Sequence, residues 1–200
     1  MAAMRTAWCL AGMAWVGVST GVAAHPHVWI DGVSTFVFEE REIVAIRHTW
    51  RFDDFFSALL IGDHDVDGDG AFDEAELADL KESAFANLEE YDYFTHVRVD
   101  GRRIPTREVD AFEAWIEDDT LVYQFDVVLP DPIDPTTTDF RAGVYDEEFY
   151  VEILLDENDP VRFAGIASGA CVFDIREDVD NPIYFGLVYP LAITVNCTTS

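Results

Sequence analysis

The chain has 200 residues, and its 40 acidic against 12 basic residues give a formal net charge of −28. This length accommodates one ordinary domain with a sizeable apolar core. The strong, diffuse negative charge argues against nucleic acids and anionic membrane surfaces as partners, because both repel acidic proteins. We therefore expect a single acidic domain with no nucleic-acid partner.

Residues 1–24 have the pattern of a secretory signal peptide. One basic residue, Arg5, precedes an apolar stretch, and small residues end the segment at Ala24. Gly, Ser and Thr interrupt the apolar stretch, which is shorter than the roughly 20 apolar residues that a transmembrane helix needs. We expect cleavage after Ala24, a periplasmic location, and no membrane insertion of the mature domain, residues 25–200.

Cleavage at that point makes His25 the first residue of the mature chain, followed by Pro26 and His27. A terminal amine beside an imidazole can chelate a metal, and this arrangement resembles the histidine brace of copper monooxygenases. In the common square-planar site, the histidine is the third residue and the amide of the second residue binds the metal after losing its hydrogen. Pro26 has no amide hydrogen, so the square-planar site is excluded here. The sequence predicts binding of Zn²⁺, Ni²⁺ or Cu²⁺ by His25 and His27. The alternative is a terminus that binds no metal.

Two alternating runs of β-branched and aromatic residues, 27–38 and 42–52, predict a β-hairpin around the tetrad 39–42. One face of the second run is apolar apart from a histidine, and we assign this face to the core. It carries Val44, Ile46, His48, Trp50 and Phe52.

If the two strands pair about this tetrad, the numbers of any two residues that face each other add up to about 81. His27 then faces Asp54, and His48 faces Val33, far along the strand. Asp53 or Asp54 is therefore a candidate carboxylate ligand beside His27, whereas His48 is predicted to be a core histidine.

Residues 65–76, with the sequence DVDGDGAFDEAE, match the twelve-residue calcium loop of an EF-hand at every specified position. Ca²⁺ takes roughly six to eight hard oxygen ligands, and Gly70 supplies the sharp bend of such a loop. The expected ligands are the side chains of Asp65, Asp67, Asp69, Asp73 and Glu76 and the carbonyl oxygen of Ala71. The alternative is a solvated acidic loop.

Helical patterns at 53–61 and 73–91 flank the loop, so we expect a helix-loop-helix insertion of the EF-hand type at about residues 53–93. Sensor EF-hands work in pairs, and the sequence contains no second loop of this pattern. We therefore expect the Ca²⁺ site to be structural.

Beyond residue 93, turn signals separate further candidate strands. These strands are 95–99, 111–117, 121–129, 149–155, 161–164, 170–175 and 187–196. Short strands with regular punctuation predict a mainly β (α+β) fold, either a β-sandwich or a small barrel that carries the helical insertion. His64, beside the loop, and His96, at a strand start, are expected to be ordinary exposed residues.

Cys9 leaves with the signal peptide, so the mature chain keeps Cys171 and Cys197. An even pair of cysteines in an oxidising compartment predicts a disulfide. Two buried thiols are the alternative.

Several motifs in this order resemble those of one family. They are AHPHVWID after the signal, TWRFDDFFSALLIGDHDVDGDG, NLEEYDYFTHVRVDG and the two late cysteines. The chain is similar to uncharacterised periplasmic proteins described as the periplasmic component of an ABC-type transport system. That family is a domain of unknown function often associated with nickel/cobalt-type or zinc-related permeases, so the resemblance implies an inner-membrane metal permease as partner. A typical substrate-binding protein has two larger α/β lobes, for which this chain is too short.

Three functions fit these features. We favour a periplasmic metal-binding accessory protein, not an enzyme, that serves a transition-metal permease and carries a structural calcium site. The second is a histidine-brace-like copper oxidase, and the third is a calcium-stabilised interaction module without a transition metal. The sequence contains no Gly-x-Ser-x-Gly, phosphate-loop or HExxH motif that would support a hydrolase or a nucleotide enzyme.

Overall fold

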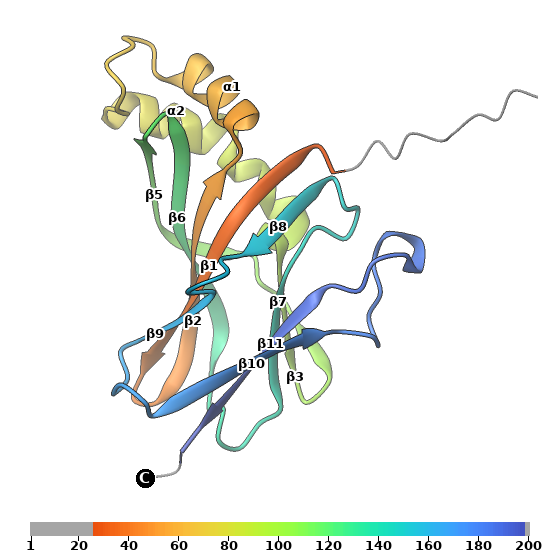
Figure 1. Ribbon diagram of the computed structural model, residues 1–200. Helices are drawn as coiled ribbons and strands as arrows, with labels where there is room; N and C mark the ends of the chain where they lie inside the picture. Colours follow the sequence, from red (N-terminus) through yellow and green to blue (C-terminus); the bar gives the residue numbers. More distant parts are fainter. Residues whose placement is uncertain (1–25, 199–200) are drawn as a thin grey trace, which may run out of the picture.

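The computed structural model describes residues 26–198, so the expected signal peptide and His25 lie outside the described residues. Within this range the chain is mainly β, as predicted, with two sheets that face each other across a shared core (Figure 1). No helix of the described chain is long and apolar enough to cross a membrane.

The first sheet has the strand order β5-β6-β2-β1-β8, and β9 also pairs with β1. Its strands are β1 (Val28–Glu39), β2 (Glu42–Phe52), β5 (Glu108–Glu117), β6 (Thr120–Ile133), β8 (Val151–Leu155) and β9 (Val161–Ala164). The pairing is antiparallel except at one edge of β1, where β8 and then β9 run parallel to it.

The second sheet has the order β10-β11-β7-β3-β4 and is antiparallel throughout. Its strands are β3 (Thr95–Val99), β4 (Arg102–Ile104), β7 (Phe140–Val144), β10 (Cys171–Glu177) and β11 (Leu191–Cys197). The prediction missed β4 and β7, which are short and lack a clear alternation of apolar and polar residues.

Aromatic side chains connect the two sheets. Phe36 of β1 meets Phe140 of β7 edge to face, with ring centroids 5.7 Å apart. Within the first sheet, Trp50 and Phe125 from the neighbouring strands β2 and β6 make a similar contact at 4.7 Å. All four side chains are almost fully buried, and burying a large apolar side chain contributes on the order of 2 kcal/mol.

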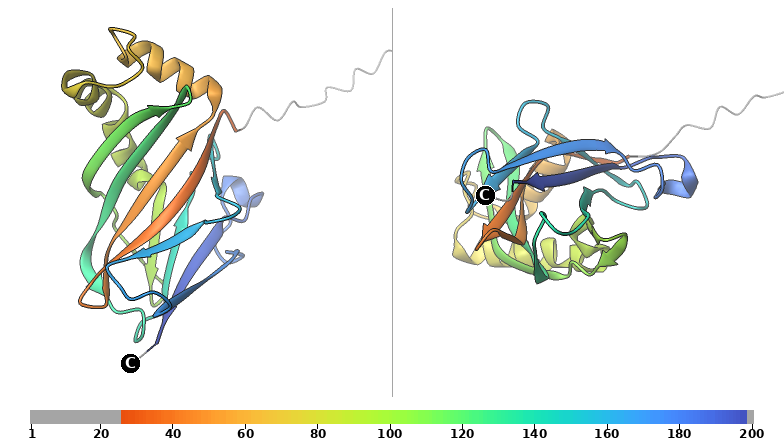
Figure 2. Two further views of the ribbon diagram at one scale, coloured as in Figure 1. Left: turned by 60° about the vertical axis from the view of Figure 1, so that its left-hand side comes forward. Right: turned by 90° about the horizontal axis from the view of Figure 1, so that it is seen from below.

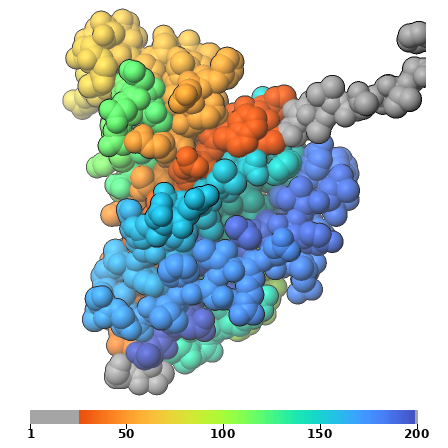
Figure 3. Space-filling model, viewed as in Figure 1, coloured from red at the N-terminus to blue at the C-terminus, as the bar shows by residue number. Residues whose placement is uncertain are grey.

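Helical segments follow β2. They are α1 (Asp54–His64), α2 (Glu74–Ser83) and the 3₁₀ segment η1 (Phe85–Phe94); a short η2 (Tyr184–Gly186) lies near the carboxyl end. Figures 1 and 2 show α1 and α2 at one end of the molecule and the carboxyl terminus at the other. In Figure 3 these helices and the loop between them form a separate projection.

The predicted helix 73–91 is wrong in its extent, because α2 ends at Ser83. The Asn87 side-chain amide donates to the Ser83 carbonyl, which helps to satisfy the end of the helix. Asp92 and Tyr93 have φ values of 51° and 49°, so the chain leaves the helical conformation before β3.

The hairpin register also needs a correction. Next to the turn, Phe38 pairs with Ile43, and their numbers add up to 81 as expected. A bulge then shifts the register, so that Val37 pairs with Ala45, and the numbers of all pairs farther from the turn add up to 82. His48 therefore faces Ser34 rather than Val33.

His48 itself is fully buried, which confirms the core prediction, and burial lowers its pKa to about 3. Its Nδ1 and Nε2 atoms lie 3.3 Å from Ser34 Oγ and 3.0 Å from Thr95 Oγ1, so both ring nitrogens have hydroxyl partners. These contacts connect β1, β2 and β3 inside the core.

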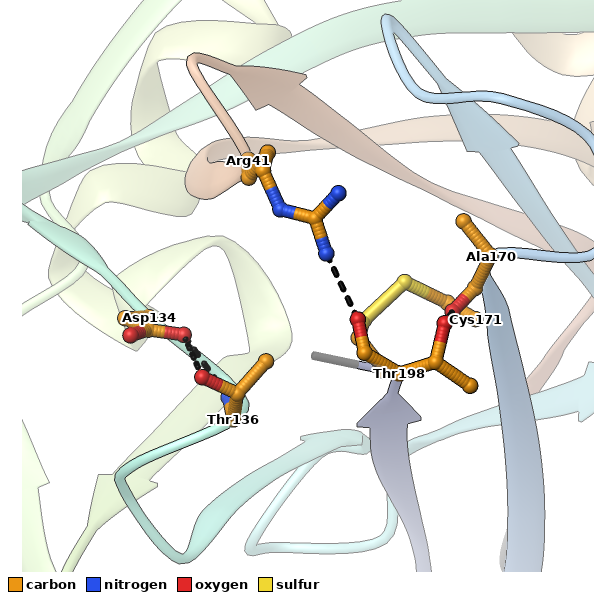
Figure 4. The surroundings of a disulfide bond; sticks show 7 residues. Arg41, Asp134, Thr136, Ala170, Cys171 and Thr198 are labelled. Atoms are coloured by element: carbon orange, nitrogen blue, oxygen red, sulfur yellow. Dashed lines mark hydrogen bonds between the residues drawn. A yellow bond between two sulfur atoms is a disulfide. The ribbon is translucent and has the colours of Figure 1, made fainter. Parts of the chain in front are cut away.

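The predicted disulfide is confirmed. Cys171 and Cys197 occupy opposite positions on β10 and β11, with Cα atoms 4.0 Å apart. One Arg41 Nη atom, from the β1–β2 turn, donates to the Thr198 carbonyl oxygen at 2.6 Å (Figure 4). The bridge and this contact hold the end of the second sheet beside the first hairpin.

Candidate metal centre

The acidic loop 65–73 is fixed at both ends by helix termini. Asp65 is the carboxyl-terminal cap of α1, and its backbone N–H donates to the Ile61 carbonyl. Asp73 is the amino-terminal cap of α2 and accepts from the backbone of Ala75 and Glu76. Each cap satisfies helix-end groups that would otherwise lack partners, so the two helices hold the loop in place.

Three carboxylates converge in this loop. Asp65, Asp67 and Glu76 each offer an oxygen, and these oxygens all lie within 4.8 Å of one another. This is the one group of at least three His, Cys, Asp or Glu side chains in residues 26–198 with such proximity. Hard carboxylate oxygens at this spacing suit Ca²⁺ or Mg²⁺ rather than a soft metal.

Backbone amides of the loop orient the Asp65 carboxylate. One oxygen accepts from the N–H groups of Gly68 and Asp69 at 3.0 and 3.2 Å, and the other accepts from Gly70 at 3.1 Å. Gly68 and Gly70 have φ values of 71° and 83°, which glycine adopts without strain. The glycines therefore permit the tight turn that aims these amides inward.

Glu76 is the most buried acid of the loop, with 9% of its surface exposed. Its Oε1 accepts from Val66 at 2.7 Å, and its Oε2 accepts from Asp73 at 3.0 Å. A buried carboxylate needs such donors to offset its lost hydration. Glu76 thereby connects the second helix to both ends of the loop.

The neighbouring carboxylates affect the pKa of Asp67. The backbone N–H of Asp69 is the largest single influence and lowers the pKa of Asp67. The negative charges of Asp69, Glu76 and Asp65, together with desolvation, nevertheless raise this pKa overall. A cation between the carboxylates would remove the cause of that repulsion.

The other three predicted ligands lie in the same loop but outside the three-carboxylate group. Asp69 accepts from the backbone N–H of Ala71 at 2.9 Å, and Asp73 is engaged as the helix cap. The structure thus brings together half of the predicted ligand set and leaves Asp69, Ala71 and Asp73 around it.

The prediction that His64 is exposed is wrong, because only 7% of its surface is accessible. Its Nδ1 contacts Asp79 Oδ2 of α2, and both residues line a hollow of about 390 Å³ that also contains Asp67, Asp73 and Glu76. The sequence offered a signal for this contact. A histidine stands in the last turn of the helix before the loop, and an acid stands in the helix after the loop.

The prediction that His96 is exposed is also wrong, since 6% of it is accessible. Its ring stacks on Tyr145 at 3.9 Å, and its Nε2 lies 2.8 Å from the Tyr145 carbonyl oxygen. Burial is the main cause that lowers its pKa. Arg103 donates to the other ring nitrogen and pairs with Asp92 and Glu147. Tyr145 lies 49 positions away, so no local pattern could reveal this burial.

His27 lies directly before β1 and is attached to the sheet. Its backbone N–H donates to the Tyr150 carbonyl at 2.8 Å, and its ring lies 4.7 Å from the Tyr150 ring. His25, the other predicted ligand, lies outside the described residues.

The register places Asp53 opposite Trp29, two positions from His27, because the Asp53 N–H donates to the Trp29 carbonyl. The Asp53 carboxylate accepts from the backbone of Trp29, Phe55 and Phe56 and is the amino-terminal cap of α1. Asp54 begins that helix and is exposed. Asp53 therefore has a structural role at the position where a metal ligand was predicted.

A sequence profile described as "Protein of unknown function (DUF1007)" matches residues 10–185. The chain belongs to this family. The matched range includes the whole loop 65–76 and Cys171, whereas Cys197 lies beyond it.

Two relatives are uncharacterised as well. The chain is 30% identical over 131 residues to the "Uncharacterized 15.5 kDa protein in trpE 3'region" of Spirochaeta aurantia. This alignment covers 66% of this chain and 93% of the relative. It is also 25% identical over 168 residues to an uncharacterised protein of Haemophilus influenzae, in an alignment that covers 83% of this chain and 80% of the relative. No solved structure matches the chain.

Proposed function

We propose that this member of the family is a periplasmic metal-binding accessory protein whose loop 65–76 holds one structural Ca²⁺. The observation that carries this proposal is the convergence of the Asp65, Asp67 and Glu76 carboxylates within 4.8 Å. Like charges at this distance repel, and a divalent cation between them replaces the repulsion with coordination. Asp69, the Ala71 carbonyl and Asp73 complete the proposed EF-hand ligand set.

A structural role follows from what the loop connects. It joins α1 to α2, and α2 leads into η1, whose Phe85 packs against Phe125 in the core with ring centroids 5.0 Å apart. A cation in the loop would hold the two helices at a fixed angle and thereby stabilise their contact with the first sheet. A single loop of this kind suits such a role better than a sensor role.

The periplasmic part of the proposal is supported by the disulfide between Cys171 and Cys197, because such bonds persist in oxidising compartments. The described residues contain no helix that could cross a membrane, which is compatible with this location.

The calcium proposal is tested by thermal unfolding of the mature chain with and without Ca²⁺. A cation present at about a hundredfold its Kd stabilises the folded state by about 2.7 kcal/mol, so the melting temperature should rise clearly. Glu76→Gln should remove most of this rise, since bidentate ligation uses both carboxylate oxygens.

Glu82→Gln is the matched control, because it removes the same charge from an exposed position of α2. The control should respond to Ca²⁺ like the native chain. Equal responses of the two variants would refute the assignment of the loop.

We also propose that the terminal amine and imidazole of His25, together with His27, bind Zn²⁺, Ni²⁺ or Cu²⁺ for delivery to an inner-membrane permease. The attachment of His27 to Tyr150 at the start of β1 favours this site, because it holds one imidazole at a defined place on the sheet. Of the two predicted carboxylate ligands, exposed Asp54 remains the proposed one, because the Asp53 carboxylate accepts from three backbone N–H groups as the cap of α1.

Metal analysis of protein purified from the periplasm separates the three functions. Zinc or nickel would support the accessory protein. Copper together with peroxide-dependent oxidation would support the brace-like oxidase instead, and calcium alone would support an interaction module.

A further inference from the structure

An apolar cavity of about 190 Å³ lies between the first sheet and the helical segments that cover it. Ile30, Trp50 and Tyr123 of the sheet form one wall, and Leu60 of α1 and Phe85 of η1 belong to the opposite wall. All five side chains are buried. The cavity lies at the end of the molecule that carries α1, and none of the proposed metal ligands lines it (Figure 1).

The cavity reaches the surface at a rim of less buried side chains. Phe56 of α1, Ala84 and Leu88 are partly buried, and Tyr150 is 49% exposed. A small molecule could therefore enter past this rim without disrupting the core, and its contacts with the inner wall would exclude water.

The wall presents almost no polar surface. Trp50 Nε1 and Tyr123 OH are themselves buried with almost no accessible surface, so both residues contribute ring carbons rather than polar atoms to the wall. An ordered water needs about two to four polar partners, and a buried ion needs charged or polar ones. The cavity is therefore unsuited to ordered water, to metal ions and to charged molecules.

Most of the wall is aromatic. Seven of the side chains that line the cavity carry rings, namely Trp50, Phe52, Phe56, Phe85, Phe94, Tyr123 and Tyr150. Aromatic side chains make favourable offset and edge-to-face contacts with another ring. The wall therefore favours a ring compound over an alkyl chain of the same size.

We propose that this cavity binds a small aromatic hydrocarbon, or an equally small uncharged ring compound without strong hydrogen-bonding groups. A dry protein cavity of about 150 Å³ with apolar walls binds benzene. The larger volume of about 190 Å³ accommodates a benzene ring with about two further carbon atoms. Burial of the ring against the aromatic wall supplies the affinity, and the size of the cavity supplies the selectivity.

The test compares three probes by isothermal titration of the mature chain in the presence of Ca²⁺. Ethylbenzene fits the cavity, triethylbenzene is too large for it, and benzoate is similar in size to ethylbenzene but charged. We expect ethylbenzene to bind at least tenfold more tightly than either of the other two. A general apolar surface would instead bind triethylbenzene at least as well, because hydrophobic affinity rises with the buried area.

Ala84→Leu places a larger side chain in the space that ethylbenzene needs and should lower the affinity for ethylbenzene at least tenfold. Ala86→Leu is the matched control, because Ala86 is exposed and does not line the cavity, and it should bind ethylbenzene like the native chain. Without ligand, the melting temperature of Ala84→Leu should not fall below that of the native chain, since filling a cavity is stabilising.

Three results would overturn the proposal. They are no binding of ethylbenzene, equal affinities for ethylbenzene and either of the other probes, or an unchanged affinity for ethylbenzene in a folded Ala84→Leu protein. The first two are measured on the native chain, so they decide the matter even if Ala84→Leu does not fold. Because no proposed metal ligand lines the cavity, these results leave the calcium proposal unaffected.

Discussion

Nδ1 of His64, in the last turn of α1, lies 2.8 Å from Oδ2 of Asp79 in α2. The contact joins the two helices beside the acidic loop. His64 is buried, whereas the Asp79 side chain is 66% exposed, so solvent screens much of any charge interaction.

Asp79→Ala should therefore lower the free energy of unfolding by about 0.5–1 kcal/mol, mainly through the lost hydrogen bond to a buried ring. Asp63→Ala removes an equal charge from an exposed position of α1 and should have a smaller effect. Urea unfolding at pH 7 with saturating Ca²⁺ measures both variants. Equal losses would show that the contact contributes only through net charge.

His48 makes the stability depend on pH. Its folded-state pKa of about 3 lies below the unfolded value of about 6.5, because burial disfavours the charged ring. The unfolded chain takes up a proton first as the pH falls, so this contribution to stability is complete above pH 6.5 and is lost between pH 6.5 and 3.

The loss should amount to about 1.4 kcal/mol per pH unit within this window. His48→Gln removes the titrating group, so its deficit in stability relative to the native chain should shrink as the pH falls from 7 to 4. Urea unfolding of both proteins at several pH values measures the difference. A deficit that stays constant with pH would mean that the imidazole titrates normally.

The disulfide should contribute about 3 kcal/mol, since it closes a loop across 26 positions in the unfolded chain. Replacing both Cys171 and Cys197 by serine should lower the melting temperature accordingly. Calcium should still stabilise this variant, because the bridge lies far from the helices, at the carboxyl-terminal end of the molecule (Figure 2). A variant as stable as the native chain would contradict the expectation.

One additional residue before His25 separates the α-amine from that imidazole while leaving charge and strand almost unchanged. Affinity for Cu²⁺ or Zn²⁺ should fall at least tenfold, which corresponds to about 1.4 kcal/mol. His27→Ala should weaken binding as well, whereas His48→Ala should lower only stability. Isothermal titration of the three proteins provides the comparison, and unchanged affinity of the extended chain would eliminate the amino-terminal site.

Periodicity in the sequence predicts elements well where the residues that decide them are local. Glu42–Phe52, Thr95–Val99 and Val161–Ala164 form strands with the expected bounds. The hairpin register was off by one position because the bulge leaves Val44 unpaired between Ile43 and Ala45, and no turn signal marks it. A single inserted residue changes every pairing that follows.

Features that depend on distant residues could not be predicted. The burial of His96 depends on Tyr145, and the role of Asp53 depends on the Trp29 amide, which the register brings to it. The pairing of Trp50 with Tyr123 in the first sheet joins residues 73 positions apart, so no local pattern could predict it. The loop 65–76 could be predicted because its proposed ligands all lie within one segment of twelve residues.

The parallel edge of β1 has a consequence for folding. Val28 pairs with Val151 and Ser34 with Val161, so this edge stays open until contacts across more than a hundred positions have formed. Closing so long a loop lowers the conformational entropy of the chain before the strand contacts can stabilise it, and this slows folding. The antiparallel pairs β1–β2 and β5–β6 need only short turns and can form first. Until β8 and β9 arrive, β1 presents unpaired N–H and C=O groups to any other extended chain, so aggregation competes with folding at this strand.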